Sequence, residues 1–286
     1  HALEAAGCEI IRIAVPDEAA AMAVDRIKEQ ITIPLIADIH FNYKLAIMCA
    51  ERGIDALRIN PGNIGGEERV KAVAEACRRK RIPIRIGVNG GSLEKSLRAK
   101  YGGVTAEALV ESAMGHVKLL NRYDFDDICI SVKCSDVPLT MRSYTLLSQQ
   151  TDYPLHLGVT EAGTPAMGMI KSAMGIGGLL CMGIGDTMRV TLTADPVEEV
   201  YAAQRILRAA GLRRDGVNLI ACPTCGRTRI DLIPMAEEVE RRLAGCKKNI
   251  TVAVMGCAVN GPGEASAADV GIAGGDGEGL IFRNGE

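Results

Sequence analysis

Three cysteines in the last quarter of the chain have neighbours and spacing that suit chemistry rather than packing. Cys222 and Cys225 form a Cys-Pro-Thr-Cys turn after a strand-like segment, and Cys257 follows a second such segment. Prolines and glycines beside them place the thiols in turns, where backbone N–H groups can reach sulfur. Two neighbouring parallel strands would bring both loops together at one edge of a sheet.

Four interpretations of these cysteines compete. A redox-active CxxC between a strand and a helix leaves Cys257 and Glu264 without a role. Zinc favours four Cys or His ligands, but only Cys246 is spare and no histidine lies in this part of the chain. Inert core thiols do not suit turns. An iron–sulfur cluster fits best, with Glu264 as a harder and more exchangeable fourth ligand. The alternative for Glu264 is a surface carboxylate.

Basic residues recur near the carboxyl ends of short apolar segments in the first 212 residues. They are Arg12, Arg58, Arg85, Lys133 and Arg189. Only Asp38, Glu161 and Asp186 offset them. A buried excess of cations is costly without an anion, and arginine forks suit phosphate oxygens. The pattern predicts a site for a small, highly charged anion such as a diphosphate. The alternative for any one arginine is a strand-end ion pair.

Strands and helices alternate along this part of the chain, which indicates parallel strands with crossover helices. The expected strands are Ile10–Val15, Pro34–Ile39, Leu57–Asn60, Ile84–Asn89, Ile128–Cys134, Leu155–Thr160 and Met188–Thr193. Polar residues end nearly every strand, where a doubly wound sheet would show one glycine-rich turn. An α/β fold of the TIM-like (β/α)₈ barrel type is therefore favoured. We expect the first strand to be missing, because the chain reads as cut at both ends.

The period of two along a strand places further polar residues on the same face as the basic ones. The expected neighbours are Asp38 with His40, Arg58 with Asn60, and Arg85 with Asn89. In a barrel this face points into the mouth, where active sites lie. These side chains are therefore predicted to line one site.

The character of the sequence changes after the segment 211–216, which is a candidate linker between two domains. We expect a barrel domain over residues 1–212 and a small α+β iron–sulfur domain over residues 213–286, incomplete at its carboxyl end. Val217–Ala221 and Ile250–Met255 are its expected strands, and Ile230–Leu243 is its expected helix.

The composition excludes several classes of protein. A net charge of −2, 3% aromatic residues and no tryptophan argue against nucleic-acid binding. No apolar run approaches the roughly 20 residues of a membrane span. No secretory signal is recognised, so a reducing, cytoplasmic location is expected. The remaining thiols are interpreted as buried and reduced: Cys8, Cys49, Cys77, Cys129 and Cys181.

Taken together, seven motifs resemble one family over the full chain. They are Ala37-Asp-Ile-His-Phe41, Leu57-Arg-Ile-Asn-Pro-Gly-Asn-Ile-Gly65, Ile84-Arg-Ile-Gly-Val-Asn89, Thr160-Glu-Ala-Gly163, Gly183-Ile-Gly-Asp-Thr187, Ala221-Cys-Pro-Thr-Cys225 and Gly256-Cys-Ala-Val-Asn-Gly-Pro-Gly-Glu-Ala265. The chain resembles the two-domain bacterial 4-hydroxy-3-methylbut-2-en-1-yl diphosphate synthases, iron–sulfur oxidoreductases of the non-mevalonate isoprenoid pathway.

The resemblance implies a complete set of expectations. The barrel would bind 2-C-methyl-D-erythritol 2,4-cyclodiphosphate, with Arg12, Arg58, Asn60, Arg85, Asn89, Lys133 and Arg189 as substrate ligands. Residues matching Cys222, Cys225, Cys257 and Glu264 would hold a [4Fe–4S] cluster. The enzyme would be a homodimer, one subunit's cluster domain capping the other's barrel. Two electrons would come from reduced flavodoxin or ferredoxin, and the ring would open with loss of water.

Further roles are hypotheses from the residue types. Glu264 would be an exchangeable ligand, Glu161 would carry a proton, and Asp38 and His40 would position or protonate the departing oxygen. An alternative is a phosphate-binding barrel lyase of the aldolase type, with Lys133 forming a Schiff base and the second domain structural. An iron–sulfur carrier would leave the cationic barrel mouth without a use.

Overall fold

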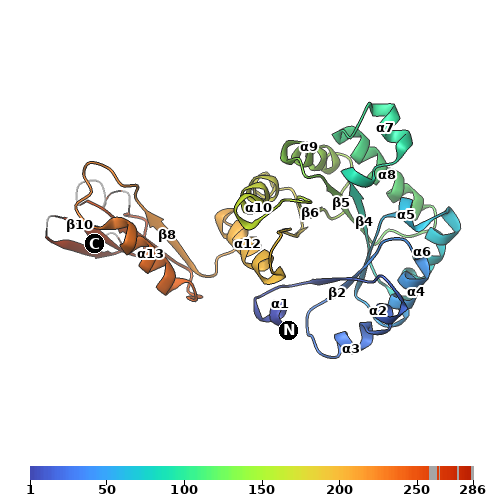
Figure 1. Ribbon diagram of the computed structural model, residues 1–286, viewed down its shortest axis with the longest axis horizontal. Helices are drawn as coiled ribbons and strands as arrows, with labels where there is room; N and C mark the ends of the chain where they lie inside the picture. Colours follow the sequence, from blue (N-terminus) through green and yellow to red (C-terminus); the bar gives the residue numbers. More distant parts are fainter. Residues whose placement is uncertain (258–262, 264, 276, 285–286) are drawn as a thin grey trace. The chain divides into compact units, whose positions relative to one another are not determined.

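The computed structural model of the chain describes residues 1–257, 263, 265–275 and 277–284, and every structural statement below concerns these residues (Figure 1). The chain divides into two compact units, His1–Ala210 and Gly211–Glu286. Each unit has its own sheet, and each is described by itself.

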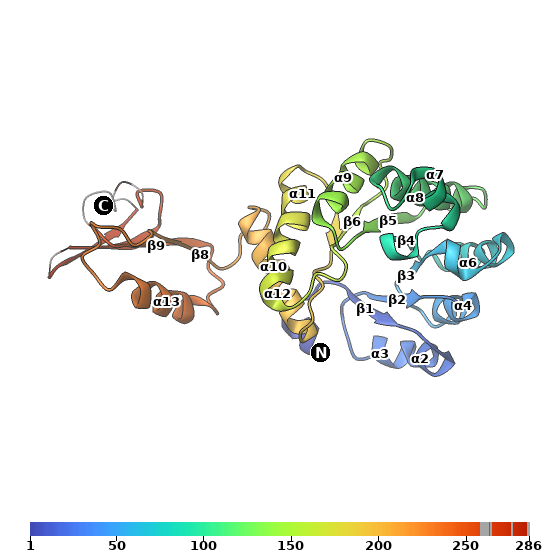
Figure 2. The same ribbon diagram turned by 45° about the horizontal axis from the view of Figure 1, so that its top comes forward.

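The first unit is built on a five-stranded parallel sheet in the order β1-β2-β3-β4-β5. Its strands are β1 (Ile11–Ala14), β2 (Leu35–Ile39), β3 (Ala56–Ile59), β4 (Ile84–Asn89) and β5 (Ile128–Lys133). The sheet order follows the sequence order, so each connection places a helix on the outer face (Figure 2). All five residues of β2 and five of the six in β4 are buried, as expected for strands covered on both faces.

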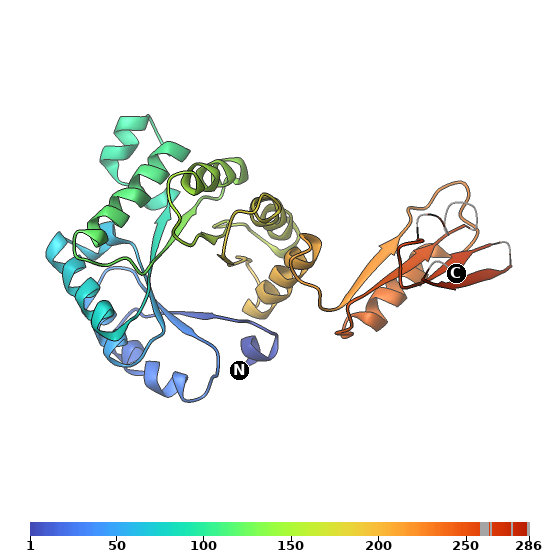
Figure 3. The same ribbon diagram turned by 180° about the vertical axis from the view of Figure 1, so that it is seen from behind.

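Two further strands extend this wall. β6 (His156–Leu157) pairs in parallel with β7 (Thr187–Met188), and a single bridge between Ile130 and Leu155 connects β5 to β6. The seven strands curve as a barrel wall does, as the view from behind shows (Figure 3). No ladder joins β7 to β1 within residues 1–210. The α/β fold is therefore confirmed, whereas closure of the barrel is not shown.

Helices follow the strands, and several begin with a residue whose side chain caps the first turn. Asn42, Thr105, Asp136 and Asp195 accept hydrogen bonds from backbone N–H groups at such starts. The main outer helices are α4 (Tyr43–Glu51), α6 (Glu67–Lys80), α8 (Ala106–Asn121), α9 (Val137–Ser148), α10 (Pro165–Ser172) and α12 (Pro196–Ala209). The shorter ones are α1 (Ala2–Ala5), α2 (Glu18–Met22), α3 (Val24–Lys28), α5 (Pro61–Ile64), η1 (Gly90–Ser92), α7 (Lys95–Tyr101), the π-helical turn η2 (Ala173–Gly177) and α11 (Gly178–Cys181).

The core of the first unit lies between the sheet and this layer of helices. Leu35, Leu57, Ile84 and Ile130 of the strands are almost fully buried in it. Cys49 and Cys77 are also buried there, as predicted. Cys181 is exposed, however, so its interpretation as a core thiol was wrong. α11 ends at Cys181, and the next residue, Met182, is exposed as well.

The second unit is a four-stranded sheet in the order β11-β10-β9-β8, with one helix, α13 (Leu232–Leu243), on its face. Its strands are β8 (Val217–Ala221), β9 (Ile250–Met255), β10 (Val270–Gly274) and β11 (Gly279–Arg283). β8 and β9 are parallel neighbours, which confirms the expected pairing behind the two cysteine loops. None of the helices in the described residues has the length and apolar character that crossing a membrane requires.

Candidate active site

Five basic residues gather along the strands of the first unit. They are Arg12 on β1, Arg58 on β3, Arg85 on β4, Lys133 on β5 and Arg189 just after β7. Arg58, Lys133 and Arg189 lie toward the carboxyl ends, as predicted, whereas Arg12 and Arg85 are each the second residue of their strand. Arg85 is buried, with 8% of its surface exposed, and the others are partly buried. Arg12 and Lys133 are both influenced electrostatically by Arg58, Arg85 and Arg189, and Lys133 also by Arg12. The predicted grouping of the cations is therefore present.

Asp38 on β2 is the carboxylate at the centre of this group. One of its oxygens lies 2.9 Å from Arg12 Nη1, and the other accepts a hydrogen bond of 3.0 Å from Arg58 Nη1. Asp38 is 3% exposed. Since both oxygens are occupied, Asp38 is placed to orient the two guanidinium groups.

Arg85 and Lys133 have no such partner. Among the described residues, no hydrogen bond or ion pair joins either of them to a carboxylate. Burial is the first cause that lowers the pKa of each, and neighbouring arginines lower it further. The pKa of Arg12 is likewise lowered, to about 10, by burial and then by Arg189. An unbalanced set of cations of this kind is what an anion with several charges stabilises.

Two glycines make room for the basic side chains. The Arg58 guanidinium lies directly over Gly87 of β4, where a Cβ atom would collide with it. At Gly158, a Cβ atom would lie 2.8 Å from Lys133 Nζ. A side chain at Gly87 or Gly158 would therefore displace the basic group that lies over it. Arg58 Nη2 also lies 3.4 Å from the Gly87 carbonyl oxygen, to which it donates.

His156 lies beneath the cations and was not predicted as a site residue. Its Nδ1 is 2.9 Å from Thr187 Oγ1, and its Nε2 is buried without a hydrogen bond. Burial, followed by Lys133 and the arginines, lowers the pKa of His156 well below its usual value. The ring is therefore neutral at physiological pH and adds no further positive charge.

Glu161 lies in the turn after β6 and is exposed. Its backbone φ of 52° is in the left-handed region, which is uncommon for a residue other than glycine. Thr160 N–H donates to the Cys134 carbonyl oxygen at 3.2 Å, so this turn is held beside the end of β5. A strained backbone of this kind is often found at functional sites.

Two expectations about the mouth need correction. His40 lies past the end of β2 and is exposed, with its ring 6.2 Å from that of Phe41, so it does not share the buried position of Asp38. Asp186 accepts a hydrogen bond from Leu155 N–H at 2.8 Å. Asp186 therefore lies at the amino ends of β6 and β7 and does not offset the positive charge of the basic side chains. Glu199 does so instead, because its Oε2 is 3.6 Å from Arg189 Nε.

The predicted asparagines end their strands as expected. Asn60 is buried and its Oδ1 accepts from Gly62 N–H at 3.1 Å, which caps α5. Asn89 is the last residue of β4 and, with its amide oriented to match its neighbours, accepts from Arg58 Nη2 at 3.3 Å. Both asparagines therefore lie at the same edge of the sheet as the cations.

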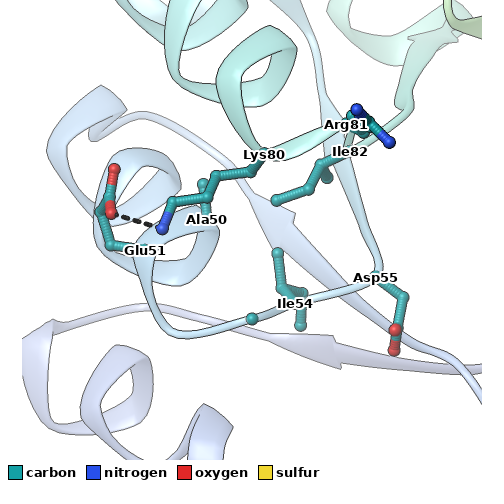
Figure 4. Close-up of a pocket in the computed structure, with 8 residues that line it drawn as sticks. Ala50, Glu51, Ile54, Asp55, Lys80, Arg81 and Ile82 are labelled. Carbon is teal, nitrogen blue, oxygen red and sulfur yellow. Dashed lines mark ion pairs between the residues drawn. The ribbon is translucent and has the colours of Figure 1, made fainter.

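A pocket of about 290 Å³ lies at the opposite end of the strands (Figure 4). It is lined by the residues that precede β3 and β4, including Asp55 and Ile82, and by the Lys80–Glu51 ion pair of 3.0 Å. The basic and acidic side chains there offset each other, so this pocket has none of the charge excess of the mouth.

In the second unit, three cysteine segments meet around Gly256. Gly256 N–H donates to Cys222 Sγ at 3.1 Å, and Cys257 is the next residue. The Gly256 carbonyl oxygen accepts from Arg229 N–H at 2.9 Å, which holds the Cys225 turn close by. The Arg227 backbone N–H is the first cause that lowers the pKa of Cys225. N–H···S contacts and thiolate character both suit iron–sulfur ligation.

The residue types and backbone placement therefore fit a cluster bound by three thiolates. Within the described part of the chain, His, Cys, Asp and Glu form no group of three or more that is arranged to hold a metal ion. Glu264, the predicted fourth ligand, lies outside the described residues. The fit rests on the convergence of the Cys222, Cys225 and Cys257 segments.

Comparisons with known proteins agree with these two units. The GcpE TIM-barrel domain matches residues 1–204, and the GcpE protein C-terminal domain matches residues 218–286. The 4-hydroxy-3-methylbut-2-en-1-yl diphosphate synthase (flavodoxin) of Geobacter sulfurreducens is 63% identical over 286 residues, covering 100% of this chain and 81% of that protein. The enzyme of the same name from Caldanaerobacter subterraneus is 62% identical over 284 residues, covering 99% and 80%.

The similarity to solved structures is weaker than the similarity in sequence. The dihydropteroate synthase of Yersinia pestis covers 73% of this chain and 85% of its own, with a TM-score of 0.47 and 14% identity, too low a score to argue from. The family matches and the sequence identities decide the assignment. The chain belongs to the GcpE family of 4-hydroxy-3-methylbut-2-en-1-yl diphosphate synthases.

Proposed function

We propose that this chain catalyses the reductive ring opening and dehydration of 2-C-methyl-D-erythritol 2,4-cyclodiphosphate to (E)-4-hydroxy-3-methylbut-2-enyl diphosphate. With substrate and product both written as neutral acids, the reaction takes up two electrons and two protons and releases one water molecule. The observation that carries the proposal is the group of five basic side chains around one buried carboxylate, within a family named for this reaction. A cyclic diphosphate supplies the negative charge that these cations lack.

The basic residues would bind and orient the diphosphate. Arg58, held by Asp38 on one side and resting over Gly87 on the other, presents a fixed guanidinium to phosphate oxygens. Arg85 and Lys133 have no carboxylate partner among the described residues and are therefore available to the substrate. Asn60 and Asn89 supply neutral hydrogen-bonding groups at the same edge.

Glu161 is proposed to deliver a proton to the hydroxyl group that leaves as water. Its exposed position after β6 lets it exchange protons with solvent before the mouth is covered. We propose that Asp38 acts through the arginines rather than as the acid, because one of its oxygens accepts from Arg58 and the other forms an ion pair with Arg12.

Cys222, Cys225, Cys257 and Glu264 are proposed to hold a [4Fe–4S] cluster, which supplies electrons one at a time. Gly256 N–H donates to Cys222 Sγ and so fixes the position of this sulfur. Flavodoxin, named for the relatives, is the proposed electron donor. The family resemblance also supports a homodimer in the cytoplasm, one subunit's cluster domain covering the partner's barrel.

The decisive test is turnover by the full-length protein, reconstituted without oxygen. With reduced flavodoxin and the cyclodiphosphate, we expect the linear allylic diphosphate by NMR, and none when flavodoxin is omitted. Consumption of substrate without an electron donor would contradict the proposal. Trapping of a carbonyl compound on Lys133 by borohydride would then favour the aldolase-type alternative.

Substrate binding is expected to take up protons. The Lys133 pKa is lowered in the unliganded protein, and a bound polyanion raises it again by favouring the ammonium form. Affinity should therefore fall as the pH rises through the Lys133 pKa of the unliganded protein. Calorimetry of cyclodiphosphate binding in two buffers with different protonation enthalpies measures this uptake.

His156 also has a lowered pKa and lies beside Lys133, so a control must separate the two groups. Lys133→Met should lose most of the proton uptake, whereas His156→Gln should retain it. Equal binding heats in both buffers for the wild type, after correction for dilution, would rule out the coupling.

A further inference from the structure

One imidazole connects two loops at the barrel mouth. His116 projects from α8 and is 9% exposed. Its Nε2 lies 3.1 Å from Glu94 Oε1, within ion-pair distance although not aligned as a hydrogen bond. On its other side the ring faces Gly62, where an added Cβ atom would lie 3.5 Å from His116 Cε1. The ring therefore lies between the loops after β3 and β4, next to Glu94 on one side and one methyl group's width from Gly62 on the other.

The loop after β3 carries Asn60. Asn60 Oδ1 accepts from Gly62 N–H at 3.1 Å, so the asparagine amide is fixed by the residue that faces the imidazole. The whole of α5 is one short turn beginning at Pro61. A shift of Gly62 would therefore move the Asn60 side chain directly.

The loop after β4 carries Asn89 and ends at Glu94. The Glu94 carboxylate accepts from Ser112 Oγ at 2.9 and 2.8 Å, again on α8. His116 is the first cause that lowers the pKa of Glu94 to about 2, so this group is ionised throughout the physiological range. Between the two ends of the loop, Arg98 Nη2 donates to the Gly90 carbonyl oxygen at 2.7 Å. The loop is thus anchored to α8 close to His116.

We propose that His116 and Glu94 form a positioning pair that couples the loops bearing Asn60 and Asn89 and so sets the affinity of the mouth for a diphosphate. This inference rests on the proposed function, because it takes Asn60 and Asn89 as substrate ligands. Neither member of the pair touches the substrate. Their effect is to keep two amide groups at the separation that one bound diphosphate requires.

His116→Ala is the first test. It removes the ring that fills the space beside Gly62 and leaves Glu94 bound to Ser112 alone, so we expect KM for the cyclodiphosphate to rise about ten- to a hundredfold with kcat within twofold of wild type. The EPR spectrum of the reduced protein should be unchanged. His116→Gln, whose amide can donate to Glu94, should recover most of the loss. Glu94→Gln keeps the Ser112 contact and should raise KM less than His116→Ala does.

Glu111→Gln is the matched control. Glu111 lies on the same helix and holds α7 through Lys100 Nζ at 2.8 Å and through the Tyr101 hydroxyl, but it does not touch Gly62. If anchoring α7 were all that mattered, Glu111→Gln would raise KM as much as His116→Ala. That result, or equal losses in kcat and KM with no rescue by glutamine, would overturn the proposal.

Binding of inorganic pyrophosphate to the same variants separates this inference from the reaction. A wild type that binds pyrophosphate but does not convert the cyclodiphosphate would contradict the proposed function alone. Pyrophosphate affinity that is lowered in His116→Ala and recovered in His116→Gln would still support the positioning pair, and equal affinity in all variants would refute it.

Discussion

Cys257→Ser is expected to abolish turnover and most of the iron content of the full-length protein. Cys257 is 9% exposed, and it follows the residue whose N–H binds Cys222 Sγ. A serine hydroxyl is a poor ligand for iron in a site built for thiolates. The visible absorption and the EPR signal of the reduced protein should therefore collapse together with activity.

Cys246→Ser provides the control for this prediction. Cys246 lies in the same unit, in the turn after α13, and is only partly buried. It should retain colour, iron and turnover. A Cys257→Ser protein with the wild-type spectrum would remove this cysteine from the ligand set and would reopen the zinc and dithiol interpretations.

Arg85→Met is expected to raise the stability of the substrate-free protein while weakening substrate binding. Arg85 is buried without a carboxylate partner among the described residues, and methionine fills a similar volume without a charge. Replacing a buried charged group by an apolar one stabilises by about 1 kcal/mol or more, or roughly 2–4 °C in Tm. Losing a charged hydrogen bond to phosphate should raise KM about ten- to a hundredfold.

Arg58→Met tests whether the effect on stability depends on a carboxylate partner, which Arg58 has and Arg85 lacks among the described residues. Arg58 donates to Asp38, so its removal leaves this carboxylate paired only with Arg12. We expect KM to rise, as in Arg85→Met, but Tm to fall. Thermal unfolding without ligand and steady-state kinetics measure both quantities. A lower Tm for Arg85→Met would show that this cation is balanced in the unliganded protein.

The strands of the first unit were predictable because their apolar runs are short and end in polar residues. β4 has the predicted bounds, Ile84–Asn89. β6 and β7 were predicted as six-residue strands but pair over only two residues each, and β6 is joined to β5 by a single bridge. A hydrophobic pattern does not report whether a neighbouring strand lies close enough to form a ladder.

The grouping of the cations was also predictable from the period of two along each strand, but their partners were not. Glu199 lies in the first turn of α12, where an acidic residue is expected for the helix dipole alone, so nothing in the sequence connects it to Arg189. His116 gave no signal either, since a single histidine on an apolar helix face usually indicates packing. Its neighbours Glu94 and Gly62 are 22 and 54 residues away in the chain.

The close approach of Arg58 to Gly87 has a consequence for how this barrel can diverge. A side chain at residue 87 would displace the Arg58 guanidinium from its present position, and with it the hydrogen bond to Asp38. The absence of a side chain at residue 87 therefore helps to fix the direction in which Arg58 points. A variant barrel with a larger residue at 87 would keep the positive charge of Arg58 but present it to an anion from a different angle.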